Sequence, residues 1–330
     1  MKAMLFVIAA LTAPAFAQSA FAHARTVTIS ADGKGAYPTL QAAIDALHDT
    51  GGEIDLQPGV YREKATVSGP DLHLKGLGAG PEAVVIVWGD SAASTGSTFK
   101  SSTLLASGDG FRADNLTIQN DYAQHTDVGS QAVALSLTGD KAVLTHVRLM
   151  GAQDTLYVNK GPQGRMSRDY FADCYIEGHV DFIFGNAKAY FHGCEIHGVA
   201  HAEVMYTAQS KNAPDEDSAF VFEDCTFTAG PGAQKVSLGR AWRAYATVIL
   251  LNARIDTPLI KGGWREWRPG QTETLKTATY AEYKSTGPGA DPAGREPYSH
   301  QLTDAQAAAW RLNAFFKGDV GWLPPEAQKQ

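Results

Sequence analysis

The feature that most constrains the fold of this chain is an internal repeat. Three segments share one pattern of Phe, Cys and a large apolar residue, namely Phe171–Ile176, Phe191–Ile196 and Phe222–Phe227. A looser form of the pattern occurs three more times, at Asn115–Ile118, His146–Leu149 and Asn252–Ile255. Because apolar and outward-facing positions alternate within each unit, we expect each unit to be a β-strand.

The spacing of these units predicts the architecture. Equivalent positions from Leu116 to Ala253 are 31, 27, 20, 31 and 28 residues apart, and the turns between them are rich in Gly, Asn and Asp. Short strands that recur at such a period are typical of a solenoid whose coils stack on one another. A β-sandwich or barrel would instead show turn signals about every 8 to 12 residues. We therefore expect an all-β fold, a parallel β-helix.

The two ends of the chain differ from its middle, as the open ends of a solenoid require. The apolar residues of Leu40–Leu47 follow Thr39 at helical spacing, which predicts a short capping helix. Thr303–Gln306 is a capping-box pattern ahead of further apolar residues, which predicts a second one. The stretch Lys276–His300 is rich in Gly and Pro and lacks periodicity, so we expect segment 276–330 to be irregular and helical.

The N-terminal residues are typical of a secretory signal peptide. Lys2 precedes an apolar run, Ala3–Ala13, and a small-residue cleavage site, Ala15–Ala17. We expect residues 1–17 to be removed on export and residues 18–330 to form one extracellular or periplasmic domain. No later apolar run approaches the roughly 20 residues of a membrane span. With a net charge of -7, the chain also lacks the clustered basic residues that bind nucleic acid.

The repeat aligns two aspartates. Asp154 lies seven residues after Val147, and Asp181 lies seven residues after Cys174, so the two occupy equivalent positions on successive coils. Paired strands place such backbones about 4.8 Å apart with their side chains on one face. Two carboxyls this close raise the pKa of one, while a cation can keep the other ionised. The pair suits an acid and a nucleophile, although solenoid aspartates also satisfy turn amides.

The three cysteines occupy the same position in three repeats. Stacked coils would place neighbouring Cα atoms about 5 Å apart, which is within disulfide reach. Cys174 and Cys194 are the best candidate pair because only 20 residues separate them, and export would permit oxidation. A ladder of buried free thiols is an equal alternative.

Five motifs connect the chain with a known family. They are Gly59–Glu63, Gln131–Leu135, Gln153–Leu156, Cys174–Gly178 leading into Asp181–Gly185, and Leu238–Trp242. In the order and intervals of these motifs, from about Val27 to Trp267, the chain resembles the pectin methylesterases. The resemblance implies a right-handed parallel β-helix and a pectinesterase that converts methyl-esterified homogalacturonan to pectate and methanol. It also implies that no cofactor and no metal take part, and a capped solenoid is expected to be a monomer.

The resemblance assigns a role to each residue of the reaction. Asp181 matches the nucleophile, and Arg240 matches the partner that keeps Asp181 ionised and oriented. Asp154 matches the general acid and base. Gln131 and Gln153 match the amide donors that stabilise the oxyanion.

Four aromatic residues match those that stack on sugar rings in the family, namely Tyr157, Phe182, Trp242 and Trp267. Phe184 is expected to pack inward. Two positions depart from the family pattern, because Ala241 stands where Pro is usual and Ser130 stands where His often occurs. Ala241 would relax the turn that aims Arg240 and Trp242, so we expect an effect on substrate positioning.

Three other functions are compatible with parts of the sequence. The same carboxylates could serve an esterase or thioesterase acting on another acyl group. A β-helical polysaccharide lyase would need a calcium-binding acidic cluster and a basic residue for proton abstraction. A non-catalytic polysaccharide-binding solenoid would not need the aspartates. His192, His197 and His201 match no zinc-binding spacing and are interpreted as surface turn residues.

Overall fold

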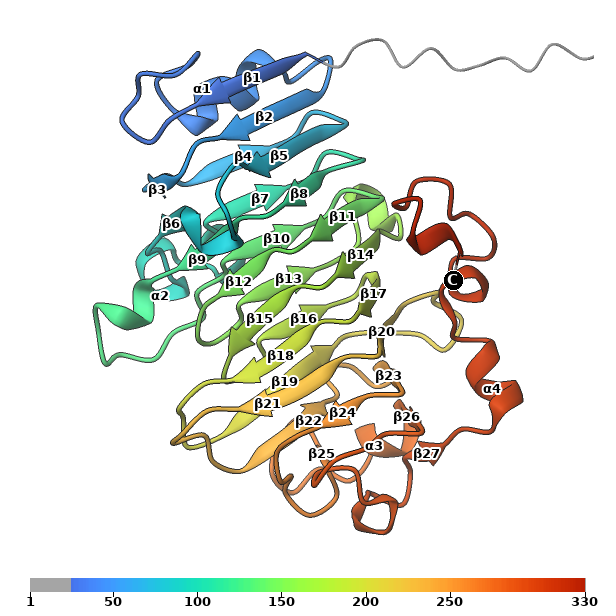
Figure 1. Ribbon diagram of the computed structural model, residues 1–330. Helices are drawn as coiled ribbons and strands as arrows, with labels where there is room; N and C mark the ends of the chain where they lie inside the picture. The colour runs from blue at the N-terminus through green and yellow to red at the C-terminus, as the bar shows by residue number, and fades with distance from the viewer. Residues whose placement is uncertain (1–24, 330) are drawn as a thin grey trace, which may run out of the picture.

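The chain forms a parallel β-helix, as the repeat predicted. The computed structural model describes residues 25–329, so the predicted signal peptide lies outside the described residues. Three parallel sheets run the length of the solenoid, one with eleven strands and two with eight each (Figure 1). Eight coils each contribute one strand to each sheet in turn, and three further strands at the ends of the chain extend the first sheet. We name the sheets A, B and C in that order.

The strands of each sheet stack in the order of the chain. Sheet A consists of β1 (Thr26–Ile29), β2 (Gly52–Leu56), β5 (Leu72–Gly76), β8 (Arg112–Asp114), β11 (Ala142–Thr145), β14 (Arg168–Ala172), β17 (Lys188–His192), β20 (Ala219–Glu223), β23 (Thr247–Leu251), β26 (Thr279–Tyr283) and β27 (His300–Gln301). Sheet B consists of β3 (Gly59–Tyr61), β6 (Val84–Trp88), β9 (Thr117–Asn120), β12 (Arg148–Met150), β15 (Tyr175–Gly178), β18 (Glu195–Gly198), β21 (Thr226–Ala229) and β24 (Arg254–Ile255). Sheet C consists of β4 (Ala65–Val67), β7 (Leu104–Ala106), β10 (Leu135–Leu137), β13 (Leu156–Val158), β16 (Ile183–Gly185), β19 (Val204–Gln209), β22 (Val236–Arg240) and β25 (Trp264–Arg265).

Short helices interrupt or flank the coils. The α-helices are α1 (Leu40–Ala46), α2 (Ala92–Thr95), α3 (Thr274–Thr277), α4 (Asp304–Ala308) and α5 (Leu312–Phe315). The 3₁₀ turns are η1 (Pro81–Ala83), η2 (Thr98–Lys100), η3 (Tyr122–Gln124), η4 (Pro162–Gly164), η5 (Pro292–Gly294) and η6 (Ala327–Lys329). Within residues 25–329, no helix has the length and apolar character needed to cross a membrane.

The sequence repeat marks the corner between sheets A and B. In every repeat one residue has a φ between 50° and 63°, and these residues are Asn115, His146, Asp173, Gly193, Asp224 and Asn252. The next residue, such as Cys174 or Ala253, points into the core and is almost completely buried. The expectation of one strand per repeat was therefore wrong, because a left-handed residue divides each unit between two strands. Asn, Asp and Gly tolerate this conformation best, which explains their frequency there.

The cysteines form a ladder of free thiols inside the solenoid. Cys174, Cys194 and Cys225 are all buried and unbonded, so the structure corresponds to the alternative without a Cys174–Cys194 disulfide. Burial raises the pKa of the Cys174 and Cys194 thiols well above the usual value. A thiol in this environment packs as a small apolar side chain.

The predicted N-terminal capping helix is confirmed. The Thr39 hydroxyl accepts a hydrogen bond from the Ala42 amide at 3.1 Å, which satisfies one free donor of the first turn of α1. Leu40 and Ile44 face the core and close the first coil.

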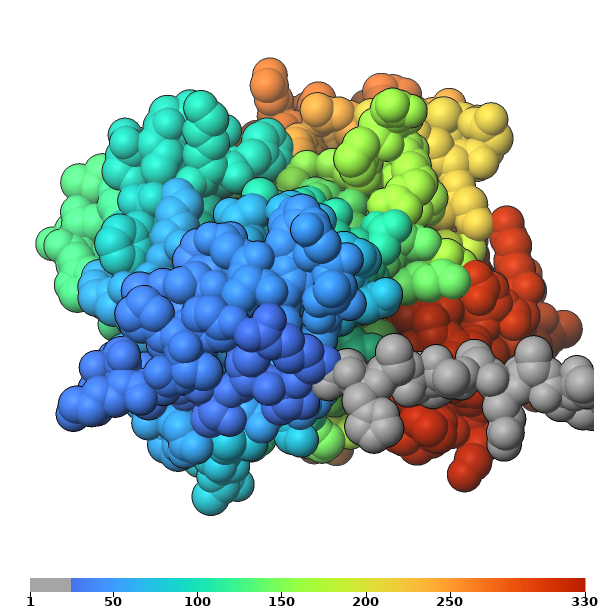
Figure 2. Space-filling view, turned by 90° about the horizontal axis from the view of Figure 1, so that it is seen from above, coloured from blue at the N-terminus to red at the C-terminus, as the bar shows by residue number. Residues whose placement is uncertain are grey.

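The C-terminal segment differs from its prediction in two respects. The expected irregular stretch includes β26, which extends sheet A beside β23. The capping box of Thr303 and Gln306 is present, but the helix that it begins ends at Ala308 and a second one, α5, follows. These helices lie against the outer face of sheet A rather than across the last coil (Figures 1 and 2).

Candidate active site

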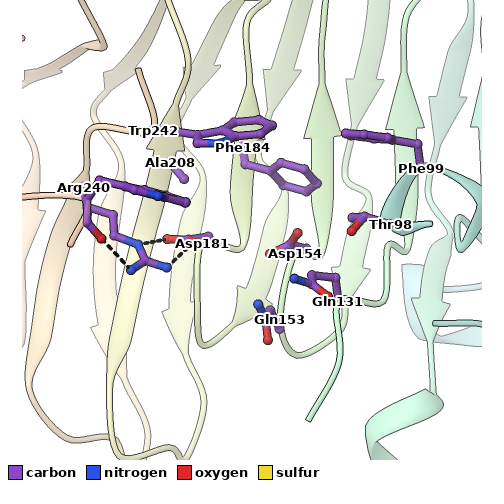
Figure 3. Close-up of a pocket in the computed structure, with 11 residues that line it drawn as sticks. Thr98, Phe99, Gln131, Gln153, Asp154, Asp181, Phe184, Ala208, Arg240 and Trp242 are labelled. Atoms are coloured by element: carbon purple, nitrogen blue, oxygen red, sulfur yellow. Dashed lines mark hydrogen bonds and ion pairs between the residues drawn. The ribbon is translucent and has the colours of Figure 1, made fainter. Parts of the chain in front are cut away.

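An open cavity lies on the outer face of sheet C, near the middle of the solenoid. Its volume is about 220 Å³. It is lined by side chains of β16, β19 and β22, of the turns ahead of β10, β13 and β16, of η2, and of the segments that follow β22 and β25 (Figure 3). The lining residues are Thr98, Phe99, Gln131, Gln153, Asp154, Asp181, Phe184, Ala208, Arg240, Trp242 and Trp267.

The two aspartates lie side by side in this cavity, as their equivalent positions predicted. Leu156 pairs with Ile183 in the parallel register, so the residues two positions earlier, Asp154 and Asp181, occupy neighbouring coils. Each has a left-handed backbone, with φ of 65° and 53°, a conformation that Asp tolerates better than most residues. Only 8% of Asp154 and 5% of Asp181 is exposed. The turn ahead of each strand thus holds a largely desolvated carboxyl in the cavity.

Arg240 forms a two-pronged ion pair with Asp181. The Nε and Nη2 atoms of Arg240 donate to the two carboxylate oxygens at 2.9 and 2.7 Å. Its Nη1 atom donates to the carbonyl oxygen of Trp267 at 3.2 Å, and the guanidinium lies 4.2 Å from the centre of the Trp267 ring. This bidentate geometry fixes the carboxylate plane as well as its charge. The predicted pairing of Arg240 with Asp181 is therefore present in the structure.

The two carboxyls have different electrostatic surroundings. Burial raises the pKa of Asp154 well above its usual value, and the negative charge of Asp181 raises it further. Burial also raises the pKa of Asp181, but the hydrogen bonds and charge of Arg240 oppose that increase. The proton shared by the pair therefore belongs on Asp154, and the negative charge belongs on Asp181.

Two glutamines, Gln131 and Gln153, lie beside Asp154 in the cavity (Figure 3). The main-chain carbonyl of Gln153 accepts from the Ala132 amide at 3.0 Å, and that of Gln131 accepts from the Ala92 amide at 2.8 Å. These bonds fix the two turns relative to each other and to α2. Neither glutamine side chain makes a hydrogen bond within residues 25–329, so both carboxamides can donate to a bound group.

A row of aromatic side chains follows the groove from one side of the carboxyls to the other. Ring centres are 4.9 Å apart for Phe99 and Tyr157, 4.8 Å for Tyr157 and Phe184, and 6.0 Å for Phe184 and Trp242. Trp242 and Trp267 stack at 6.3 Å. Tyr157, Trp242 and Trp267 therefore lie on the face where the sequence placed them.

The sequence predicted Phe182 in the groove and Phe184 in the core, and both predictions were wrong because the two side chains take the opposite places. Phe182 is completely buried in the core, where its ring meets Tyr206 edge to face at 5.5 Å. Phe184 points outward into the cavity. The left-handed bend at Asp181 is the reason, because Phe182 belongs to that bend and not to the alternation of β16, which begins at Ile183.

Sequence reasoning missed Phe99 and Thr98. Both belong to η2, in the long excursion between β6 and β7, where no repeat unit marks them. Phe99 is 50% exposed, although it contacts the row of aromatic side chains. The only sequence signal was a lone aromatic residue within a polar loop, which is a weak indication of a binding residue.

The two departures from the family pattern leave the site assembled. Ala241 is buried, and the amide of the next residue, Trp242, donates to the carbonyl oxygen of Gln209 at 3.1 Å. This hydrogen bond holds Trp242 in its stacked position without a proline. The Ser130 hydroxyl accepts from the Ala93 amide at 3.1 Å and so anchors α2 beside the cavity. Within residues 25–329, no group of three or more His, Cys, Asp or Glu side chains is arranged to hold a metal ion.

Comparisons with known proteins agree with this geometry. The family model described as pectinesterase matches residues 26–319. Pectinesterase 31 of Arabidopsis thaliana is 33% identical over 318 residues, which covers 92% of this chain and 96% of that protein. The structure of pectin methylesterase from carrot has a TM-score of 0.80 and 29% identity, covering 92% of this chain and 96% of that one.

A further solved structure is a pectin methylesterase in complex with a hexasaccharide. It has a TM-score of 0.71 and 30% identity, and it covers 89% of this chain and 96% of the other. The family match spans nearly all of the described residues, and the relatives are matched over most of their own length. The chain belongs to the pectinesterase family of carboxylic ester hydrolases.

Proposed function

We propose that this protein hydrolyses the methyl esters of homogalacturonan through an acyl-enzyme formed on Asp181. One observation carries the proposal. Within a single cavity, a carboxylate held by Arg240 lies beside a second carboxyl, that of Asp154, whose pKa is raised by burial and by its neighbour. One acid and one nucleophile in contact with the same bound ester are what the reaction requires.

In the first step the Asp181 carboxylate attacks the ester carbonyl carbon. The carbonyl oxygen becomes an oxyanion, and the side-chain amides of Gln131 and Gln153 donate hydrogen bonds to it. Preorganised donors of this kind lower the barrier because they are already directed at the charge that develops. Loss of one donor costs about 3 kcal/mol of barrier. The hydrogen bonds and charge of Arg240 oppose protonation of Asp181 and hold the attacking oxygen in place.

The tetrahedral intermediate then breaks its bond to the methoxy oxygen. Asp154 gives its proton to that oxygen, so methanol leaves and the galacturonate acyl group stays on Asp181 as an anhydride. The Asp154 carboxylate next accepts a proton from water, and the resulting hydroxide attacks the acyl carbon. Asp181 leaves as carboxylate and Asp154 is protonated again. The balance is one ester and one water converted to one carboxylic acid and one methanol.

The row of aromatic side chains gives the site its preference for a polysaccharide. Aromatic faces pack against the apolar faces of sugar rings, and the row extends to both sides of the two carboxyls. Trp242 and Trp267 stack on each other on one side, and Phe99 lies on the other. A chain of sugar units can therefore lie along sheet C while one unit presents its ester to Asp181.

The residues ahead of the described structure support export as part of this proposal. The signal-peptide pattern of residues 1–17 directs the chain out of the cytoplasm. The polymeric substrate occurs outside the cytoplasm as well. We further propose that the mature protein acts as a monomer, because a solenoid whose first coil is closed by α1 needs no partner to cover that end.

The test is to give purified protein highly methylated pectin and to measure base uptake in a pH-stat and methanol in the same sample. Equal amounts of acid and methanol are expected, and the Gln153→Ala variant should release both about 10²-fold more slowly. Base uptake without methanol would identify a different acyl substrate. Absence of both with the wild-type protein would refute the proposed function.

A further inference from the structure

The turn that carries Asp181 contains a histidine that the proposed mechanism does not use. His179 is the first residue after β15, and Asp181 follows two positions later, ahead of β16. The turn holds Asp181 with a φ of 53° and with a carboxyl that is almost completely buried. The backbone of this turn therefore sets where the attacking oxygen lies.

Neighbouring coils hold three of the four main-chain polar groups of His179 and Val180. The His179 amide donates to the carbonyl oxygen of Ala152 at 2.9 Å, and the His179 carbonyl oxygen accepts from the Met205 amide at 2.7 Å. The Val180 carbonyl oxygen accepts from the Asp154 amide at 3.1 Å. The turn of the nucleophile is thus bonded directly to the backbone of the second aspartate.

The fourth of these groups, the Val180 amide, bonds to a side chain. It donates to the Nδ1 atom of His179 at 2.8 Å. A main-chain amide that loses its partner inside a folded protein costs free energy comparable to a lost hydrogen bond, so the imidazole completes the bonding of this turn. Through the two peptides of Val180, the ring is connected to Asp181 along the chain and to Asp154 across the coils.

The surroundings of His179 keep its ring neutral and fixed. Nδ1 can accept a hydrogen bond only when the ring is neutral and its proton is on Nε2. Burial, and then the neighbouring His201, lower the pKa of His179 to about 4. The two rings stack with centres 4.1 Å apart and planes 14° apart, and the Nδ1 atom of His201 lies 2.7 Å from the carbonyl oxygen of Glu203. A second anchored ring therefore covers the first.

The turn of the other aspartate lacks such a side chain. Because Leu156 pairs with Ile183, Ala152 occupies in the earlier coil the position that His179 occupies in the later one. An alanine side chain offers no acceptor to a main-chain amide. Of the two turns, the one that carries the nucleophile has the additional support.

We propose that His179 is a positioning residue for the nucleophile, because its Nδ1 atom holds the Val180 peptide and so keeps the Asp181 carboxylate at attacking distance from the ester carbonyl. The inference rests on the proposed function and adds a residue to its mechanism. His179 does not line the catalytic cavity, so it acts through the backbone of the turn. Its loss should slow the chemical step and leave substrate binding by the row of aromatic side chains unchanged.

Two variants, His179→Asn and His179→Gln, separate positioning from a general structural role. The Oδ1 atom of Asn lies the same number of bonds from Cα as the Nδ1 atom of His, whereas the polar atoms of Gln lie one bond further away. His179→Asn should therefore keep the acceptor for the Val180 amide and a kcat within about 2-fold of wild type. His179→Gln should lower kcat about 10-fold with little change in KM, because a small misplacement of the reacting groups is costly. Equal kcat values for the two variants, or an effect on KM alone, would overturn the proposal.

The matched control is His197→Gln, which removes an imidazole from the next coil. His197 lies on β18, is half-buried like His179, and its Nδ1 atom lies 2.7 Å from the Thr228 hydroxyl. It bonds to no turn that carries an aspartate of the site, so this variant should keep the wild-type kcat. A loss equal to that of His179→Gln would assign the effect to a general disturbance of sheet B and contradict the positioning role.

Hydrogen exchange supplies a readout that does not depend on turnover. In the peptide that spans residues 178–184, the Val180 amide should exchange with deuterium about 10-fold faster in His179→Gln than in wild type or His179→Asn, because it has lost its acceptor. Unchanged exchange in His179→Gln would refute the hydrogen-bond role. If wild-type protein releases no methanol from pectin, the proposed function fails, whereas the exchange measurement still decides whether His179 holds the turn.

Discussion

The outer faces of sheets A and C are built by the same coils, but only one of them is covered by the chain itself. On sheet A, Tyr170, Tyr190 and Ile249 pack beneath Phe315 and Phe316 of the C-terminal segment. On sheet C, Tyr157 and Phe184 form a smaller aromatic cluster that stays open at the cavity. The difference shows how a solenoid can assign stability and function to different faces. Sheet A is covered by packed side chains, whereas sheet C holds the buried carboxyls of Asp154 and Asp181 in a cavity that opens to solvent.

The strongest way to break this comparison is to replace Asp181 on the open face. Asp181→Asn keeps the shape but removes the nucleophile, so kcat should fall by at least roughly 10³-fold. The free energy of unfolding should change far less than that of a core variant. Methanol release and urea unfolding measure the two effects. Asp304→Asn, an exposed substitution on α4, is the control and should keep full activity. Substantial turnover by Asp181→Asn would exclude the acyl-enzyme mechanism.

Phe315→Ala makes the opposite change on the covered face. Phe315 is 4% exposed and packs against Tyr190, so truncation should lower the free energy of unfolding by about 3 kcal/mol. Activity per folded molecule should stay constant, because the site lies on another sheet. Phe99→Ala is the matched control for stability, since Phe99 is half exposed and should cost little. A large loss of kcat in folded Phe315→Ala protein would show that the two faces are coupled.

Phe182 and Phe184 sharpen the comparison within a single turn. Phe182→Ala opens a void in the core and should destabilise the protein by about 3 kcal/mol, with little effect on KM. Phe184→Ala removes a ring from the groove and should raise KM roughly 5-fold, in keeping with the ~1 kcal/mol of an aromatic contact. Thermal unfolding and steady-state kinetics on pectin separate the two outcomes. The reverse pattern would return the binding role to Phe182.

The smallest effect concerns the dependence of stability on pH. In the folded protein the pKa of Asp154 is raised above its unfolded value, mainly by burial and then by Asp181. Its contribution to stability is therefore complete below the unfolded pKa and is lost as pH rises through the folded pKa. Asparagine does not ionise, so Asp154→Asn avoids this loss of stability. At neutral pH the free energy of unfolding of the variant should therefore exceed that of wild type, and the difference should vanish toward acid.

Urea unfolding of wild type and Asp154→Asn at several pH values checks this sign. Each unit of pKa shift corresponds to about 1.4 kcal/mol. Asp304→Asn supplies a control of opposite sign, because Tyr283 and Lys284 lower the pKa of Asp304. That pairing stabilises the protein above the unfolded pKa and fades as pH falls. A gain for Asp154→Asn that grew toward acid would mean that Asp154 is ionised in the folded protein.

Much of the site could be predicted because it depends on the repeat. The seven-residue offset from a core position places Asp154 and Asp181 on equivalent turns, and parallel pairing of β13 with β16 then brings the two together. Arg240 followed from its family motif, and the bidentate contact with Asp181 agrees with it. Local patterns of this kind persist in the structure because every coil repeats the same backbone path.

The errors have a common physical origin in residues that leave the repeat. Asp181 has a left-handed backbone, and the next two side chains, those of Phe182 and Ile183, both lie inside the core. A prediction based on strict in-and-out alternation along a strand cannot place two consecutive side chains inside. Phe99 comes from an excursion whose path depends on contacts with Tyr157. The free thiols of Cys174 and Cys194 likewise depend on how the stacked side chains orient, whereas their spacing fitted a disulfide or a free pair equally well.

By itself the sequence determined the solenoid and the pairing of the two aspartates, because these follow from short-range patterns of apolar residues and of Asn, Asp and Gly. Only the tertiary structure decided which face the C-terminal segment covers, which phenylalanine of the Asp181 turn enters the groove, and that Phe99 lines the catalytic cavity. These features depend on contacts between residues far apart in the chain, and the free energy of such contacts is set by the packed surroundings rather than by neighbours in sequence.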